Sequence, residues 1–201
     1  MTAARDERAA GKQRGVLLVL AGTSGAGKGT IGKLLREREP ALRWSVSWAT
    51  RPARPGEADG VDYHFRSREA FEQLRDAGGF LESFDVYGDL KGTPRGPIDE
   101  WLAAGEDVLL EIDVQGALKV KQALPEALLV FVKAPSRDEQ RRRIVERGHD
   151  PPEAIERRLA EADVEEKLAA EHFDAIVVND DVERAVAEVA GILARRRSEP
   201  R

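Results

Sequence analysis

The sequence predicts an α/β fold in which helices flank a parallel sheet. Residues 16–20 form a continuous apolar run, as expected of a strand that is buried on both faces. A helical stretch leads into each of three later apolar runs, at residues 108–110, 128–132 and 175–178. Strands that alternate with helices favour a parallel sheet. Residues 30–38 are expected to form a helix that ends before Pro40, and residues 45–47 a fifth strand.

Composition narrows the classes of protein that the chain can belong to. Its 201 residues suffice for one ordinary domain, and a hydrophobic content of 41% with 34% charged residues is typical of a globular protein. The net charge of -5 disfavours polynucleotides and anionic membranes as partners, because these need an excess of Lys and Arg. The absence of cysteine excludes disulfides, thiolate nucleophiles and Cys-based metal sites, and favours a cytoplasmic location. The basic N-terminus precedes an apolar stretch of only six residues, too short for a signal peptide or a membrane span.

Changes in composition along the chain indicate insertions into the core. Residues 1–14 are polar and are expected to be a disordered tail, followed by one domain over residues 15–198. Proline and glycine are frequent between residues 46 and 97, which predicts a small inserted subdomain of short strands and turns. Residues 134–158 are rich in arginine and are expected to form a lid. The core is then assigned to residues 15–45, 98–133 and 159–195.

A glycine-rich loop between the first strand and the first helix carries the clearest chemical signal. The segment from Gly22 to Lys28 fits G-x-x-x-x-G-K, the phosphate loop of P-loop NTPases. Its backbone N–H groups can surround a phosphate chain, and Lys28 can reach the β- and γ-phosphates. An ordinary glycine turn is the alternative, which the strand–loop–helix context disfavours. The predicted ATP-binding residues of this segment are Gly22, Thr23, Ser24, Gly25, Ala26, Gly27, Lys28, Gly29 and Thr30.

A second basic segment predicts a phosphorylated acceptor. Arg51 and Arg54 lie three residues apart beside prolines, so they can present two rigid guanidinium forks to one phosphate. A solvated basic loop is the alternative for this segment taken alone.

Together with other segments, this region resembles the guanylate kinase family. The string S-x-x-T-R-x-x-R-x-G-E begins at Ser47, and the resemblance covers roughly residues 15–195 in the order of the family. The other segments that carry it are residues 59–65, 80–82, 92–93, 110–116, 134–136, 147–148 and 178–181. The resemblance implies a P-loop kinase with an inserted GMP-binding subdomain and an arginine-rich lid. It also implies the reaction ATP + GMP ⇌ ADP + GDP, with dGMP as a further acceptor, in purine nucleotide metabolism and GMP recycling.

The resemblance assigns roles to individual acceptor-site residues. It places Arg51, Arg54 and Tyr63 at the GMP phosphate, and Ser47, Glu82, Thr93 and Asp113 at the guanine. Guanine offers two donors, N1–H and the N2 amine, which suit carboxylates, and an O6 acceptor, which suits hydroxyls. Adenine reverses this pattern and would leave carboxylates unpaired. Taken alone, residues such as Glu82 and Thr93 are more often surface residues than ligands.

The family usually has Tyr where this chain has Lys91, so we interpret Lys91 as a variant ligand of the acceptor phosphate. In the lid, the resemblance assigns Arg143 and Arg158 to catalysis with Lys28 and Arg51, and Arg143 and Arg147 to ATP binding. Arginines that close over the transferring phosphoryl group would stabilise its charge. Pairing with neighbouring glutamates as ordinary exposed helix charges is the alternative for each lid arginine.

Mg²⁺ is the expected cofactor, although no protein ligand is certain. The residue after Lys28 is Gly29 and not the usual Ser or Thr, so the metal is expected to be held by ATP oxygens and water. Glu111 is expected either to orient Mg²⁺ through water or to pair with a phosphate-loop residue.

Two other functions remain open at this point. The acceptor could be AMP or a phosphorylated sugar, against which the Ser47, Glu82, Thr93 and Asp113 set argues. The chain could also be a non-catalytic scaffold of guanylate-kinase fold, against which the intact phosphate loop argues. We expect ATP and GMP as ligands, and no polynucleotide, membrane or obligatory protein partner.

Overall fold

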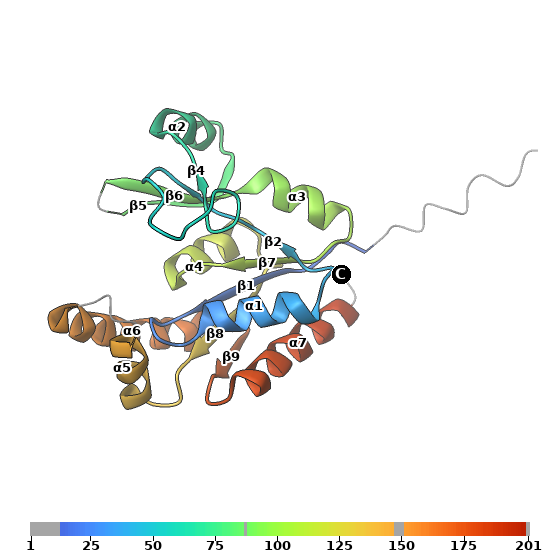
Figure 1. Cartoon of the computed structure of the whole chain (residues 1–201). Helices are drawn as coiled ribbons and strands as arrows, with labels where there is room; N and C mark the ends of the chain where they lie inside the picture. Colours follow the sequence, from blue (N-terminus) through green and yellow to red (C-terminus); the bar gives the residue numbers. More distant parts are fainter. Residues whose placement is uncertain (1–12, 87, 147–150, 200–201) are drawn as a thin grey trace, which may run out of the picture.

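The computed structural model describes residues 13–86, 88–146 and 151–199. A five-stranded parallel sheet forms the centre (Figure 1), with the strand order β2-β7-β1-β8-β9. Its strands are β1 (Leu17–Gly22), β2 (Arg43–Trp44), β7 (Val108–Glu111), β8 (Leu128–Lys133) and β9 (Ala175–Val178). Each residue of β1 is buried, as the continuous apolar run predicts for the middle strand of such a sheet. The predicted α/β fold class is confirmed.

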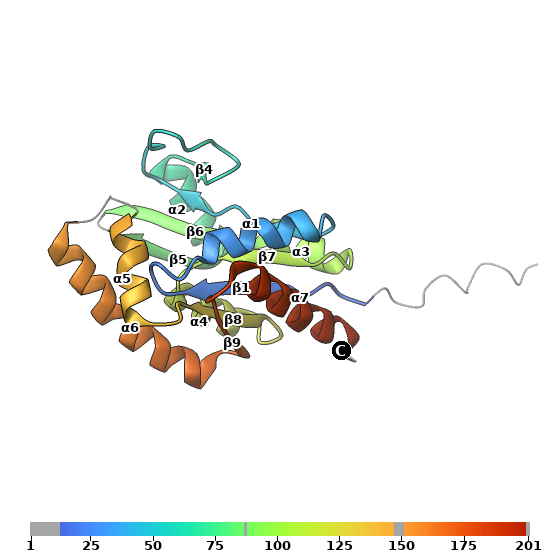
Figure 2. The same ribbon diagram turned by 60° about the horizontal axis from the view of Figure 1, so that its bottom comes forward.

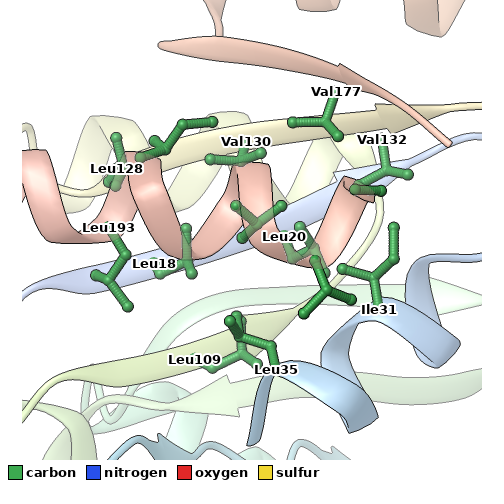
Figure 3. Packing of buried hydrophobic residues seen from close by; sticks show 14 of the residues in the cluster. Leu18, Leu20, Ile31, Leu35, Leu109, Leu128, Val130, Val132, Val177 and Leu193 are labelled. Carbon is green, nitrogen blue, oxygen red and sulfur yellow. The ribbon is translucent and has the colours of Figure 1, made fainter. Parts of the chain in front are cut away.

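Helices cover both faces of this sheet. Leu18 and Leu20 of β1 face α1 (Lys28–Arg38) and α7 (Val182–Ser198), as Figure 3 shows for Ile31, Leu35 and Leu193. The alternate residues of β1 face a second apolar cluster, to which α3 (Arg95–Ala103) and α4 (Val114–Ala123) contribute. These two packed layers fix where each strand ends, and hence where the loops that follow the strands meet.

A second, smaller sheet lies beside the core. Its order is β4-β3-β6-β5, formed by β3 (Trp48–Ala49), β4 (His64–Phe65), β5 (Phe80–Val86) and β6 (Asp89–Pro94). Helix α2 (Arg68–Asp76) packs against it, and the N-cap side chain of Ser67 accepts a hydrogen bond from the Ala70 N–H. Figure 1 shows this sheet and α2 on the side of α3 and α4. The elements between residues 46 and 97 therefore form a sheet of their own.

The described part of the arginine-rich segment is mainly helical. It comprises α5 (Arg137–Glu146) and the first turns of α6 (Pro152–His172), and Figures 1 and 2 place both at the end of the core sheet where β1 leads into α1. Helix α6 continues without a break past residue 158, where we predicted that the lid ends. No helix of the described residues is long and apolar enough to cross a membrane.

Two local predictions need correction. The helix after the phosphate loop begins at Lys28 and not at residue 30. Residues 45–47 are not a strand, because the fifth strand of the core sheet is Arg43–Trp44. The Ser45 N–H still donates to the Leu109 carbonyl oxygen at 3.0 Å, after which the chain crosses to the small sheet at Trp48. The predicted tail, residues 1–14, lies outside the described residues except for Gln13 and Arg14.

Candidate active site

The phosphate loop leaves the carboxyl end of β1 and enters α1 through glycines whose backbone geometry is demanding. Gly25 and Gly27 have φ angles of +80° and +86°, a region that side-chain-bearing residues rarely adopt. A Cβ at Gly22 would lie 2.2 Å from the Val132 carbonyl oxygen of the neighbouring strand. Gly27 is the N-cap of α1, no side chain caps this helix, and its first turn has no acidic residue. The first N–H groups of α1 are therefore directed at a site suited to an anion.

Two buried amides hold the loop in place. Gln140 of α5 donates from Nε2 to the Ser24 carbonyl oxygen at 2.8 Å. Asn179, which follows β9, donates from Nδ2 to the Ala26 carbonyl oxygen at 2.7 Å. With these two carbonyl oxygens occupied from outside, the loop N–H groups stay turned inward. Sequence reasoning gave neither amide a role, although Asn179 belongs to the segment 178–181 that carries part of the resemblance.

A cavity of about 520 Å³ opens beside this loop. It is lined by Gly25, Gly27, Thr30, Arg143, Glu146, Asn179, Asp180, Asp181 and Val182. Its residues come from the phosphate loop, from α5 and from the turn between β9 and α7. A nucleotide whose phosphates lie on the loop could place its remaining atoms here.

Two lid arginines lie over the phosphate loop. Arg143 donates from Nη2 to the Asn179 carbonyl oxygen at 3.0 Å and from Nε to Glu139 at 2.7 Å. Arg158 of α6 lies with Nη1 3.4 Å from the Ser24 hydroxyl. By contrast, Arg141 and Arg142 form exposed ion pairs with glutamates. These two arginines therefore match the alternative given above for each lid arginine, an exposed helix charge paired with a neighbouring glutamate. Arg147 falls outside the described residues.

Lys28 and Glu111 connect the phosphate loop to the next strand. Lys28 Nζ lies 4.0 Å from Glu111 Oε1 at the carboxyl end of β7. A Cβ at Gly29 would lie 3.5 Å from the same oxygen, an ordinary contact distance. Of the two expectations for Glu111, the structure contains the pairing with a phosphate-loop residue. The described residues contain no group of three or more His, Cys, Asp or Glu side chains arranged to hold a metal ion.

A second cavity, of about 400 Å³, lies between the core and the small sheet. Six of the residues that the sequence singled out line it: Ser47, Tyr63, Glu82, Lys91, Glu111 and Asp113. They come from five separate parts of the chain, which the fold brings together at the carboxyl end of β7. Asp113 also caps α4, where it accepts the Gly116 N–H at 2.8 Å.

Three polar side chains at this cavity form a hydrogen-bonded chain, of which Ser47 and Glu82 line the cavity and Thr93 is fully buried. The Thr93 hydroxyl donates to Glu82 at 2.5 Å, and the Ser47 hydroxyl lies 3.3 Å from the Thr93 hydroxyl. Glu82 and Thr93 face each other across the β5–β6 ladder, and Glu82 is only 7% exposed. This burial raises the pKa of Glu82 to about 7, which the hydrogen bond from Thr93 opposes and the nearby Asp113 reinforces. Glu82 is therefore a buried carboxyl that titrates near neutral pH.

Of the predicted phosphate-binding residues, Tyr63 and Lys91 line this second cavity, whereas Arg51 and Arg54 are not among its lining residues. Lys91 Nζ lies 3.5 Å from the Tyr63 hydroxyl, and both residues line the cavity. Arg51 is 8% exposed, and both of its terminal nitrogens donate to Glu57 at 2.6 Å. Arg54 is exposed, and its backbone N–H also donates to Glu57. Contacts from Arg51 and from the Arg54 backbone lower the pKa of Glu57 to about 2, so this carboxylate stays ionised and holds the loop.

Glu57 and Glu165 were not predicted as site residues. Glu57 ends the string that carries the resemblance, so its position offered a signal. Glu165 lies half-buried on α6, and burial raises its pKa to about 7, although the charge of Lys28 opposes this shift. Helix α6 has charged residues at nearly half of its positions, so nothing in the sequence distinguishes Glu165 from its exposed neighbours.

Comparisons with known proteins agree with this geometry. The guanylate kinase family model matches residues 14–196. A guanylate kinase of Thermus thermophilus is 53% identical over 187 residues, which cover 92% of this chain and 84% of the relative. One of Symbiobacterium thermophilum is 50% identical over 184 residues, covering 90% and 86%. The crystal structure of guanylate kinase from Anaplasma phagocytophilum superposes with a TM-score of 0.75 at 33% identity, covering 94% of this chain and 89% of that one. On its fold, its phosphate loop and these relatives, the chain belongs to the guanylate kinase family.

Proposed function

We propose that this member of the guanylate kinase family transfers the γ-phosphoryl group of ATP to GMP, and also to dGMP. The products are ADP and GDP, and the transfer is in line with no covalent enzyme intermediate. One observation carries the proposal above the others: Lys28 lies between the two cavities. Its neighbour Gly27 lines the first cavity, and its ion-pair partner Glu111 lines the second. A phosphoryl group passing between two nucleotides would therefore cross the position that Lys28 can reach.

On the ATP side, the phosphate loop binds and the lid closes. The N–H groups between Gly22 and Thr30 hold the β- and γ-phosphates at the start of α1. Arg143 donates to the phosphates from above the loop, and Arg147 assists it in ATP binding. Closure of the lid excludes water, which would otherwise compete with GMP as the acceptor.

On the acceptor side, Glu82 and Asp113 accept the N1–H and N2–H donors of guanine in the second cavity, which we call the acceptor cavity. Ser47 offers its hydroxyl to O6, and Thr93, whose one hydroxyl hydrogen is donated to Glu82, belongs to the guanine site by orienting that carboxylate. The hydrogen-bonded chain through Ser47, Thr93 and Glu82 supports this assignment, because it holds the three groups in fixed relative positions before the base arrives. The acceptor phosphate is bound by Arg51, Arg54, Tyr63 and Lys91.

The transition state carries charge on the equatorial oxygens of the transferring group. Lys28, Arg51, Arg143 and Arg158 stabilise that charge from different sides. The acceptor phosphate supplies its own nucleophilic oxygen, so no side chain has to remove a proton.

The residues near Lys28 fit Mg²⁺ bound through water. Glu111 offers a carboxylate beside the loop, and Mg²⁺ commonly keeps several waters while it binds one or two carboxylates and substrate phosphates. Bound Mg²⁺ neutralises charge on the phosphates of ATP. Glu111 would hold it through water, and Gly29 contributes no hydroxyl.

Replacing Gly29 by Ser should lower the Mg²⁺ concentration that gives half-maximal activity. The space exists, because a Cβ here would make only an ordinary contact with Glu111. The new hydroxyl would add a ligand close to the phosphates. Titration of Mg²⁺ at fixed ATP measures the effect. An unchanged Mg²⁺ dependence in a folded variant would show that position 29 does not face the metal.

The affinity for GMP should increase with pH between 6 and 8. Guanine needs the ionised form of Glu82, and with a pKa of about 7 its ionised fraction grows about tenfold over this interval. The KM for GMP should therefore fall as the pH rises. The GMP phosphate itself titrates near pH 6, so the Glu82→Gln variant serves as the control. If that variant keeps the full pH dependence, Glu82 is not its origin.

The direct test of the function is formation of ADP from ATP, Mg²⁺ and GMP. We expect ADP and GDP to appear in equal amounts, and little ADP to appear without GMP. A non-catalytic scaffold would form neither product. The proposed setting is the cytoplasm, in purine nucleotide metabolism and GMP recycling, with no polynucleotide, membrane or obligatory protein partner.

A further inference from the structure

Arg36 is a cation in the acceptor cavity to which the proposed mechanism gives no role. It lies on α1, and its guanidinium carbon stacks 4.2 Å from the centre of the Trp44 ring. Its Nε atom is buried without a hydrogen-bond partner, and no carboxylate of the described residues lies within ion-pair distance of it. Arg38, two residues further along the same helix, pairs with Glu183 instead.

Most of the charged side chains that line the acceptor cavity are acidic, so a phosphate in it needs a cation that is not already paired. Five of its lining residues are acidic, namely Glu57, Asp62, Glu82, Glu111 and Asp113. The lining cations are Arg36 and Lys91. A nucleotide phosphate that enters this cavity is repelled by the carboxylates, at short range and in a partly desolvated space. Arg51 neutralises Glu57, and Lys28 faces Glu111, so part of the basic charge nearby is already engaged.

We propose that Arg36 is a further binding residue for the phosphate of the acceptor nucleotide, which it reaches from the α1 side of the cavity. Stacking on Trp44 uses the face of the Arg36 guanidinium and leaves its edge to donate hydrogen bonds. The stacking also restricts the Arg36 side chain before a ligand arrives, so the side chain loses fewer conformations on binding. The Nε atom of Arg36 is buried and has no hydrogen-bond partner. The terminal nitrogens of Arg36 are therefore the donors that a ligand in the cavity can reach. The proposal rests on the proposed function, because it takes the ligand of this cavity to be GMP.

The test separates the phosphate from the base by measuring binding of GMP and of guanosine. For Arg36→Met we expect the Kd of GMP to rise about tenfold, the size of a lost charge-assisted hydrogen bond. The Kd of guanosine, which has no phosphate, should change less than twofold. Arg38→Met is the matched control, because it removes the same charge from the same helix at a residue outside the cavity, and it should leave both affinities unchanged.

Different outcomes contradict the proposal in different ways. Equal weakening of GMP and guanosine would mean that Arg36 shapes the cavity through Trp44 and does not bind phosphate. No change for either ligand would mean that it has no role in binding. If Arg36→Met does not fold, Arg36→Gln is measured in the same way, with the same expectations. Failure of wild-type protein to bind GMP at all would instead refute the proposed function.

Discussion

Replacement of Lys28 by Met should lower kcat for GMP phosphorylation by about 10²–10³-fold and leave GMP affinity almost unchanged. The ammonium group of Lys28 is placed where α1 begins, between the two cavities, and would stabilise charge that grows only during transfer. Its loss therefore raises the barrier without removing a contact to the bound acceptor. Met keeps much of the length of the side chain, so the change tests the charge.

Lys33→Met provides the control, since Lys33 lies exposed on the same helix. It should keep kcat close to that of the wild type. Equilibrium binding of GMP to the Lys28→Met protein separates affinity from chemistry. A normal kcat in this variant would remove Lys28 from the reaction.

The second large effect is expected at Glu82. For Glu82→Gln, kcat/KM with GMP should fall about 10–100-fold, because an amide can accept only with its oxygen and presents donors to a base edge that also donates. The fold should be little affected, because the new amide oxygen can still accept the hydrogen bond from Thr93. The substitution also removes a carboxylate whose ionised form is disfavoured by burial.

Steady-state kinetics with thermal unfolding measures both parts of this prediction. Glu72→Gln on α2 is the matched control, because the Glu72 side chain is 38% exposed and lies outside the acceptor cavity. A Glu82→Gln protein with wild-type kcat/KM for GMP would refute the role of Glu82 at the guanine.

The sequence was most informative where structure depends on local pattern. The apolar runs predicted four of the five core strands to within a residue or two, because a strand buried on both faces needs apolar side chains throughout. The phosphate loop could also be predicted from the sequence, because its glycines adopt backbone conformations that other residues avoid. The strand predicted at residues 45–47 was wrong because this segment is the crossing between two sheets, which local composition does not reveal.

Contacts between segments that are distant in the sequence were harder to predict from the sequence. Glu82 and Thr93 were singled out only through family resemblance, and the antiparallel register of β5 and β6 is what makes them neighbours. Gln140 and Asn179 support the phosphate loop across more than a hundred residues of sequence, so no spacing rule points to them. Arg36 resembles any helix-surface arginine until the fold places it over Trp44.

The most direct test of the central claim is a comparison of acceptors with ATP and Mg²⁺. Initial rates of ADP formation would be measured with GMP, dGMP, AMP and a phosphorylated sugar at equal concentrations. The arrangement of Glu82, Asp113, Ser47 and Thr93 predicts turnover with GMP at least about 10²-fold faster than with AMP. Faster turnover with AMP than with GMP would contradict the assignment of this cavity to guanine.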